Sequence, residues 1–126
     1  MASLLIVDDD EGMVETLVDI MTVRHHHVST ARSAEAAVAS VRQHVPDVVL
    51  MDIKMPAQDG VQALRAMEEI SPDIKVIMMT ALTSDPLVVE AYKSMALAIL
   101  PKPLNLANLL GLVDRVTQSR GDAQRI

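Results

Sequence analysis

The sequence has no cysteine, no phenylalanine and no tryptophan, and Tyr92 is the single aromatic residue among its 126 residues. Without cysteine it can form neither a disulfide nor a Cys-ligated zinc site. Without large aromatic side chains, Leu, Val, Ile and nine methionines must fill the core. No apolar run approaches the ~20 residues of a membrane span, and the N-terminus has no basic region before an apolar one. We therefore expect a cytoplasmic protein without membrane contact.

Basic residues are also scarce. Eleven Lys and Arg stand against seventeen Asp and Glu, which gives a formal net charge of −6, and the basic residues form no cluster. Such a surface is a poor electrostatic match for a polyanion, so we expect no direct nucleic-acid binding by this domain. Half of the residues are hydrophobic. A chain of this length and composition is expected to form one globular domain.

Four short apolar runs without polar alternation predict buried strands, at residues 4–7, 48–51, 76–79 and 98–100, and residues 28–30 are expected to form a further short strand. They alternate with stretches of helical periodicity, at residues 13–21, 34–45, 61–70, 85–94 and 106–116. This alternation predicts an α/β fold, a flavodoxin-like (βα)5 doubly wound parallel sheet with strand order 2-1-3-4-5. The domain is expected to cover residues 1–118, and residues 119–126 to form a polar tail or the start of a linker.

Polar residues follow four of these strands. Asp8 and Asp9 end the first, Asp52 the third, Thr80 the fourth and Lys102 lies just beyond the fifth. The carboxyl ends of these strands surround one crevice, where ligands bind in such sheets. Three crowded carboxylates cannot all stay ionised unless a cation compensates them, and Mg²⁺ takes carboxylate, water and phosphate oxygens. The set predicts a site for Mg²⁺ and a phosphoryl group, with a carboxylate as nucleophile.

Four motifs, each at the end of its own predicted strand, closely resemble those of the receiver domain of two-component response regulators. The resemblance covers residues 3–117. The motifs are Leu5-Ile6-Val7-Asp8-Asp9-Asp10, Val49-Leu50-Met51-Asp52-Ile53-Lys54-Met55-Pro56 with Asp59-Gly60, Ile77-Met78-Met79-Thr80-Ala81, and Lys102-Pro103.

The resemblance implies that Asp52 accepts a phosphoryl group from the phosphohistidine of a sensor histidine kinase or phosphotransfer protein. Asp9 would bind Mg²⁺ directly, Asp8 would assist through water, and the backbone carbonyl of Lys54 would complete the protein ligands beside Asp52. Lys102 would pair with Asp52 and then with the phosphoryl oxygens. Its peptide bond to Pro103 is expected to be cis.

The resemblance also implies a switch. The Thr80 hydroxyl would move to the phosphoryl group, and the small Ala81 would leave room for it. The family usually has an aromatic residue where this chain has Ile99, so the usual ring rotation cannot operate. We hypothesise that Ile99 repacks instead, or that Tyr92 contributes, although a half-buried surface ring is the simpler interpretation of Tyr92.

The output is expected through the face formed by the fourth helix, fifth strand and fifth helix, to an effector domain or a downstream protein. Dimerisation through the same face is a further expectation from the family. The domain is not expected to be a turnover enzyme, because it would catalyse only its own phosphorylation and dephosphorylation.

Three other functions would also use parts of this pattern. A haloacid-dehalogenase-type Mg²⁺ phosphatase needs Asp-x-Asp-x-Thr, which would fall on Asp8, Asp10 and Gly12, so the Thr is missing. A flavin-binding module is disfavoured because the acidic residues 8–11 would repel the phosphate. A degenerate receiver-like domain that works without phosphorylation conflicts with the intact acidic set, but Ile99 keeps it open.

Three consecutive histidines, residues 25–27, could suggest a metal site. Their side chains would alternate in direction and not converge on one ion, so we expect a solvated turn.

Overall fold

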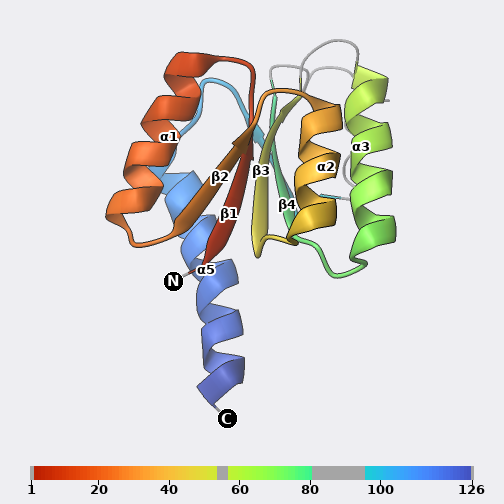
Figure 1. Cartoon of the computed structure of the whole chain (residues 1–126). Helices are drawn as coiled ribbons and strands as arrows, with labels where there is room; N and C mark the ends of the chain where they lie inside the picture. Colours follow the sequence, from red (N-terminus) through yellow and green to blue (C-terminus); the bar gives the residue numbers. More distant parts are fainter. Residues whose placement is uncertain (1, 54–56, 81–95, 126) are drawn as a thin grey trace.

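The computed structural model of the chain describes residues 2–53, 57–80 and 96–125. Five strands form its centre: β1 (Ser3–Val7), β2 (His27–Ala31), β3 (Val48–Ile53), β4 (Val76–Thr80) and β5 (Ala98–Pro101). Every neighbouring pair is parallel, and the order is β2-β1-β3-β4-β5 (Figure 1). The predicted fold and strand order are therefore confirmed.

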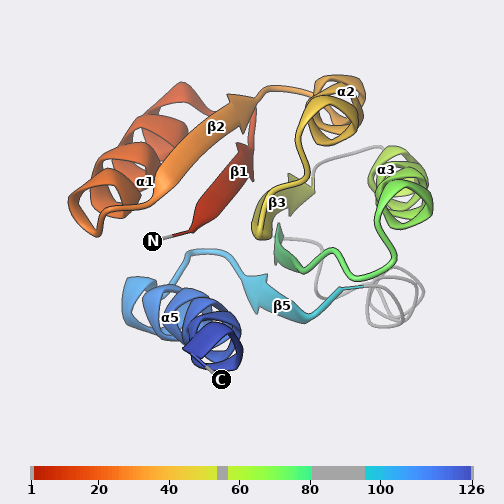
Figure 2. The same cartoon turned by 60° about the horizontal axis from the view of Figure 1, so that its bottom comes forward.

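Helices of the described residues cover both faces of the sheet. They are α1 (Glu11–Val23), α2 (Ala34–Gln43), α3 (Ala57–Ile70) and α5 (Leu106–Arg125). Figure 2 shows α1 and α5 on one side of the sheet and α2 and α3 on the other. The helix predicted at residues 85–94 lies outside the described residues. No helix in the described ranges combines the length and the apolar character needed to cross a membrane.

Successive strand residues point to opposite faces, which explains why the buried strands are apolar throughout. Leu4 and Ile6 of β1 pack in the core cluster with Leu17 of α1 and Leu109 of α5. The intervening Leu5 belongs instead to the cluster beneath α2 and α3. Methionines fill much of both clusters, as expected of a chain without Phe or Trp: Met21, Met51, Met67, Met78 and Met79 are buried.

Three helices begin at a polar side chain that accepts a hydrogen bond from a backbone N–H three residues on. Asp10 accepts from Met13 (3.2 Å), Ser33 from Ala36 (3.1 Å) and Asn105 from Asn108 (3.1 Å). Each cap satisfies one of the N–H groups that a helix start leaves unpaired.

Two expectations about helix ends were wrong. The apolar face of α2 was expected to reach Val45, but α2 ends at Gln43 and Val45 is exposed. Pro46 disfavours a helical conformation at the preceding residue, and the chain is already extended at His44. The third helix was expected to begin at residue 61, but residues 57–60 already form the first turn of α3. Ala57 and Gln58 are good helix formers, and this preference prevails over the Asp59-Gly60 turn pattern.

The last helix also differs from expectation. The predicted periodic stretch begins at Leu106, yet Leu106 is exposed, while Leu109 and Val113 are buried. α5 then continues to Arg125, beyond the periodic stretch that ends at Val116, and Figure 1 shows this end projecting from the body of the domain. The tail is therefore helical over most of its length, and its use as a linker stays a prediction.

The three histidines do not form one solvated turn. His25 has φ of 68° in the turn after α1, and His27 begins β2. His26 is half-buried and accepts a hydrogen bond from the Ala2 N–H at 3.2 Å. Burial lowers the pKa of His26, with the positive N-terminus adding to the effect. The histidines are thus used in local structure, and no group of possible metal ligands among the described residues includes one of them.

Replacing Met67 by Ala is expected to reduce the free energy of unfolding by about 2–5 kcal/mol, because Met67 is a fully buried residue of α3 and its truncation leaves a cavity in the core. Urea unfolding followed by far-UV circular dichroism measures this loss. The matched control is Val23→Ala at the end of α1, where the side chain is 76% exposed, with an expected change within about 0.5 kcal/mol. Equal losses in the two variants would contradict the core assignment.

Candidate phosphoryl and metal site

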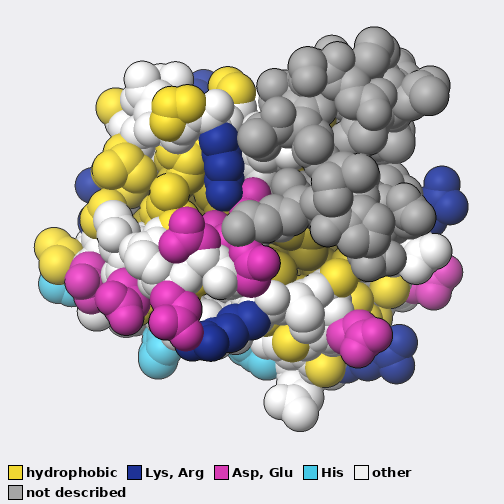
Figure 3. Space-filling model, turned by 90° about the horizontal axis from the view of Figure 1, so that it is seen from above, with side chains coloured by type: hydrophobic (Ala, Val, Ile, Leu, Met, Phe, Trp, Pro, Cys, Tyr) yellow, Lys and Arg dark blue, Asp and Glu magenta, His cyan; other side chains and the backbone are white. Residues whose placement is uncertain are grey.

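The predicted site residues lie at the carboxyl edge of the sheet. Asp8 and Asp9 directly follow β1, Asp52 is the next-to-last residue of β3, Thr80 is the last of β4, and Lys102 follows β5. Parallel pairing brings these strand ends to one edge. Viewed onto this edge, Figure 3 shows acidic side chains gathered around the centre with basic side chains beside them.

The turn from β1 into α1 holds Asp8 in place. Its backbone N–H donates to the Ala31 carbonyl at 3.1 Å, which continues the pairing with β2. Its Oδ1 accepts a hydrogen bond from the Asp10 N–H at 2.9 Å, while the Asp10 side chain caps α1. Neighbouring acidic residues therefore have different structural roles. Asp8 turns inward and is 2% exposed, whereas Asp9 is exposed at the rim.

Lys102 supplies the positive charge. Its Nζ lies 2.9 Å from Asp52 Oδ1 and 3.8 Å from Asp8 Oδ2, so the pairing with Asp52 expected from the sequence is present. The Lys102–Pro103 peptide bond is cis, as predicted. The Lys102 N–H donates to the Thr80 carbonyl at 3.1 Å. The backbone thus links the lysine to the end of β4, where Thr80 is buried.

The Lys102 ammonium group does not supply hydrogen bonds to all the buried oxygens of Asp8 and Asp52. Asp8 Oδ2 and Asp52 Oδ2 are buried and accept no hydrogen bond from the described residues. Burial raises the pKa of Asp52. The hydrogen bond from Lys102 opposes this rise, and the Asp8 carboxylate adds to it. The cluster therefore has more negative charge than its own residues compensate.

The same geometry fits a hard divalent cation. One carboxylate oxygen from each of Asp8, Asp9 and Asp52 lies within 4.8 Å of the others. Oxygen ligands in such a cluster match the preference of Mg²⁺, which retains several waters and takes one or two carboxylates. A bound cation would satisfy the two buried oxygens that lack a hydrogen bond. The donor set therefore fits the metal that the sequence predicted.

Three predicted site residues cannot be placed. Lys54, Ala81 and Tyr92 lie outside the described residues. Ile99 can be placed: it is half-buried, pairs in register with Met78 and packs against the core cluster beneath α2 and α3.

One ion pair near this edge was not predicted from the sequence. Arg32 Nη1 lies 2.8 Å from Glu11 Oε1, and both side chains are largely exposed. The sequence does contain a signal for it, because Arg32 directly follows β2 and therefore stands at the same edge of the sheet as the acidic residues. The pair compensates one charge of the acidic run at residues 8–11.

A parallel 2-1-3-4-5 sheet with this acidic cluster and lysine at its carboxyl edge defines the class of CheY-like α/β domains. Comparison with known families narrows the class. The family model described as "Response regulator receiver domain" matches residues 4–114. The chain belongs to the response regulator receiver family.

Individual relatives agree with this assignment. The chain is 36% identical over 112 residues to the transcriptional regulatory protein ZraR of Escherichia coli, covering 89% of this chain but 25% of ZraR. It is 32% identical over 116 residues to the chemotaxis protein CheY of Thermotoga maritima, covering 91% of this chain and 97% of CheY. Hence the chain spans a quarter of the length of ZraR and nearly all of CheY.

Solved structures give the same result. A CheY-like receiver domain protein from Methanospirillum hungatei superposes with a TM-score of 0.84 at 26% identity, covering 97% of this chain and 98% of that one. The non-phosphorylated receiver domain of HemR from Leptospira biflexa superposes with a TM-score of 0.80 at 25% identity, covering 92% of this chain and 94% of that one.

Mg²⁺ at about tenfold over its dissociation constant is expected to raise the melting temperature by about 5 °C, because a ligand of the folded state stabilises it by roughly 1.4 kcal/mol. Asp8→Asn should abolish this response. It should also raise the melting temperature without metal, because it removes a buried charge that repels Asp52. Differential scanning fluorimetry with and without EDTA measures both effects.

Asp19→Asn is the control, since it makes the same charge change at an exposed position on α1. Loss of the Mg²⁺ response in this variant, or its retention in Asp8→Asn, would contradict a metal site at the carboxyl edge.

Proposed function

We propose that this receiver domain is a phospho-accepting switch, in which Asp52 takes a phosphoryl group in a Mg²⁺-dependent reaction. The observation that carries the proposal is the environment of Asp52. Its side chain is 2% exposed, Oδ1 pairs with Lys102, and Oδ2 lacks a hydrogen-bond partner among the described residues, within the three-carboxylate cluster. A carboxylate held in this way keeps a lone pair for attack on phosphorus.

The donor would be the phosphohistidine of a sensor histidine kinase or phosphotransfer protein. A carboxylate oxygen of Asp52 forms the new O–P bond, the histidine N–P bond breaks, and the electron pair remains on the imidazole nitrogen. The product is an acyl phosphate. Asp8, Asp9, Asp52 and the Lys54 carbonyl would hold Mg²⁺, which supplies charge compensation for the phosphoryl oxygens.

Lys102 would change its partner after transfer. Before transfer its Nζ pairs with Asp52 Oδ1, and after transfer the added phosphoryl oxygens carry more negative charge than the carbonyl and bridging oxygens of the acyl phosphate. The Thr80 hydroxyl would turn to the same oxygens. The domain would then act as a switch with slow self-dephosphorylation and not as an enzyme with a separate substrate.

We expect the switch to act in the cytoplasm and to control transcription. ZraR is named a transcriptional regulatory protein, and NtrC of Klebsiella pneumoniae, 32% identical over 120 residues, a DNA-binding transcriptional regulator. This chain spans 25% and 26% of those proteins, so in them a comparable domain accompanies other parts of the chain.

Incubation with acetyl phosphate and Mg²⁺ is expected to add one phosphoryl group that is stable to acid and labile to base. Intact-mass spectrometry and Phos-tag electrophoresis measure the adduct. EDTA should suppress it, and Asp52→Asn should abolish it. Asp73→Asn, an exposed acid in the turn between α3 and β4, should leave it unchanged. Absence of any adduct on the unmodified chain would refute phospho-acceptance and favour a phosphorylation-independent interaction domain.

Ile99→Ala is expected to reduce the chemical-shift differences between the phosphorylated and unphosphorylated domain in amide NMR spectra, because the repacking of Ile99 hypothesised from the sequence would pass the change at Thr80 on to β5. Ile74→Ala is matched to it, since Ile74 packs against the same core cluster but lies before β4, at the opposite edge. If Ile99→Ala leaves the two states as distinguishable as Ile74→Ala does, Ile99 has no part in the relay.

A further inference from the structure

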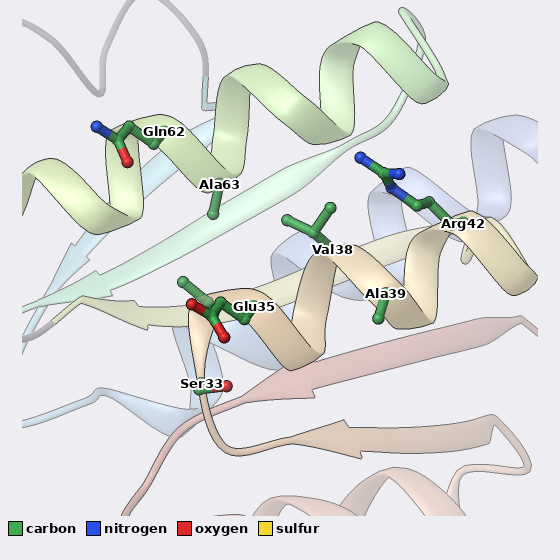
Figure 4. A pocket seen from close by; sticks show the side chains of 8 residues that line it. Ser33, Glu35, Val38, Ala39, Arg42, Gln62 and Ala63 are labelled. Carbon is green, nitrogen blue, oxygen red and sulfur yellow. The ribbon is translucent and has the colours of Figure 1, made fainter.

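A groove of about 590 Å³ lies between α2 and α3, and none of its residues belongs to the carboxylate site. Figure 4 shows Val38 and Arg42 directed from α2 towards α3, and Ala63 directed from α3 towards α2. Its lining consists of Ser33, Ala34, Glu35, Val38, Ala39, Arg42, Gln62 and Ala63. Small alanines on both helices leave the hollow open, and they would let the backbone of another helix approach closely.

The α2 side of the groove has a regular pattern. Glu35, Val38, Ala39 and Arg42 stand at positions i, i+3, i+4 and i+7, which places them on one face of the helix. Val38 is half-buried against the core, and the other three are exposed. The face therefore has a short apolar centre with an acid at one end and a base at the other.

These two charges are too far apart to pair with each other. Seven residues of α-helix span about 10 Å. Within the described part of the chain, neither Glu35 nor Arg42 forms an ion pair with another residue. A partner that fits this face would present a base opposite Glu35 and an acid opposite Arg42, at the same separation.

A second copy of α2, laid antiparallel, meets this requirement. A twofold axis between positions 38 and 39 lies midway between Glu35 and Arg42, because 38.5 is the mean of 35 and 42. That axis brings each Glu35 opposite the partner's Arg42 and places Val38 and Ala39 at the centre. A surface that complements itself in this way is the requirement for an isologous dimer.

We propose that a second copy of this chain docks on the groove, with the two α2 helices antiparallel and each seated between α2 and α3 of the other copy. The four helices then pack as two layers. Two exposed ion pairs and a short apolar stripe make a weak contact, so the dimer forms at high protein concentration and weakens with salt. This face is distinct from the fourth helix, fifth strand and fifth helix face expected for the output.

Sedimentation equilibrium of the full chain tests the proposal. The mass of the unmodified chain should rise from 13.7 kDa towards twice that value between micromolar and millimolar concentration. Glu35→Lys and Arg42→Glu should each weaken association about tenfold or more, because either change turns both ion pairs into repulsions. The double variant Glu35→Lys/Arg42→Glu should recover the association, because it exchanges the charges and keeps the pairs.

Glu15→Lys controls for net charge, since it makes the change of Glu35→Lys at an exposed position on α1, and should associate like the unmodified chain. Cross-linking gives a second readout, because the chain contains no cysteine. With a short bis-maleimide, Ala39→Cys beside the axis should form a covalent dimer faster than Glu15→Cys.

The proposal is overturned if the unmodified chain keeps a mass of 13.7 kDa throughout. It is also overturned if the double variant associates no better than the single variants, or if Ala39→Cys cross-links no faster than Glu15→Cys. Association that none of the charge reversals changes would mean that the copies meet through another surface.

Discussion

Asp8 and Asp52 are two buried carboxylates that share one ammonium group, and the carboxyl edge of the sheet depends on this imbalance. Lys102 lies closer to Asp52 than to Asp8, and each carboxylate keeps one buried oxygen without a hydrogen bond from the described residues. A buried charge without compensation is costly, so the edge favours any added cation or proton. A site in this condition responds strongly to a change of charge, which is the property a phosphorylation switch requires.

The fold is stable enough to tolerate the repulsion between these carboxylates. Asp8 and Asp52 stand at the ends of strands whose apolar residues fill both core clusters, and the burial of those strands outweighs the local repulsion. The Lys102 N–H also binds the Thr80 carbonyl, so the ends of β4 and β5 share a backbone link. A movement of either residue towards a charge on Asp52 therefore acts on both strands.

Much of the fold and site is predictable from the sequence because the information is local. A short apolar run with Asp or Thr at its end predicts both the strand and a candidate site residue, as at Asp52 and Thr80. The misjudged positions depend on competition between neighbours: Pro46 ends α2 early, and Ala57 and Gln58 draw Asp59-Gly60 into α3. The groove between α2 and α3 depends on how the two helices pack against each other. The hydrophobic periodicity of each helix does not determine that packing.

Ile99 sets the remaining constraint on the proposed switch. It packs against the core cluster on the α2 and α3 side, in register with Met78, while Thr80 is in register with Pro101. An isoleucine has neither a ring to rotate nor a hydroxyl to reposition, and its β-branched side chain is stiff. A close-packed core resists continuous deformation, so any response at Ile99 must be a shift between packed arrangements. We therefore expect the polar groups of Thr80 and Lys102 to carry the larger displacement, with β5 following them.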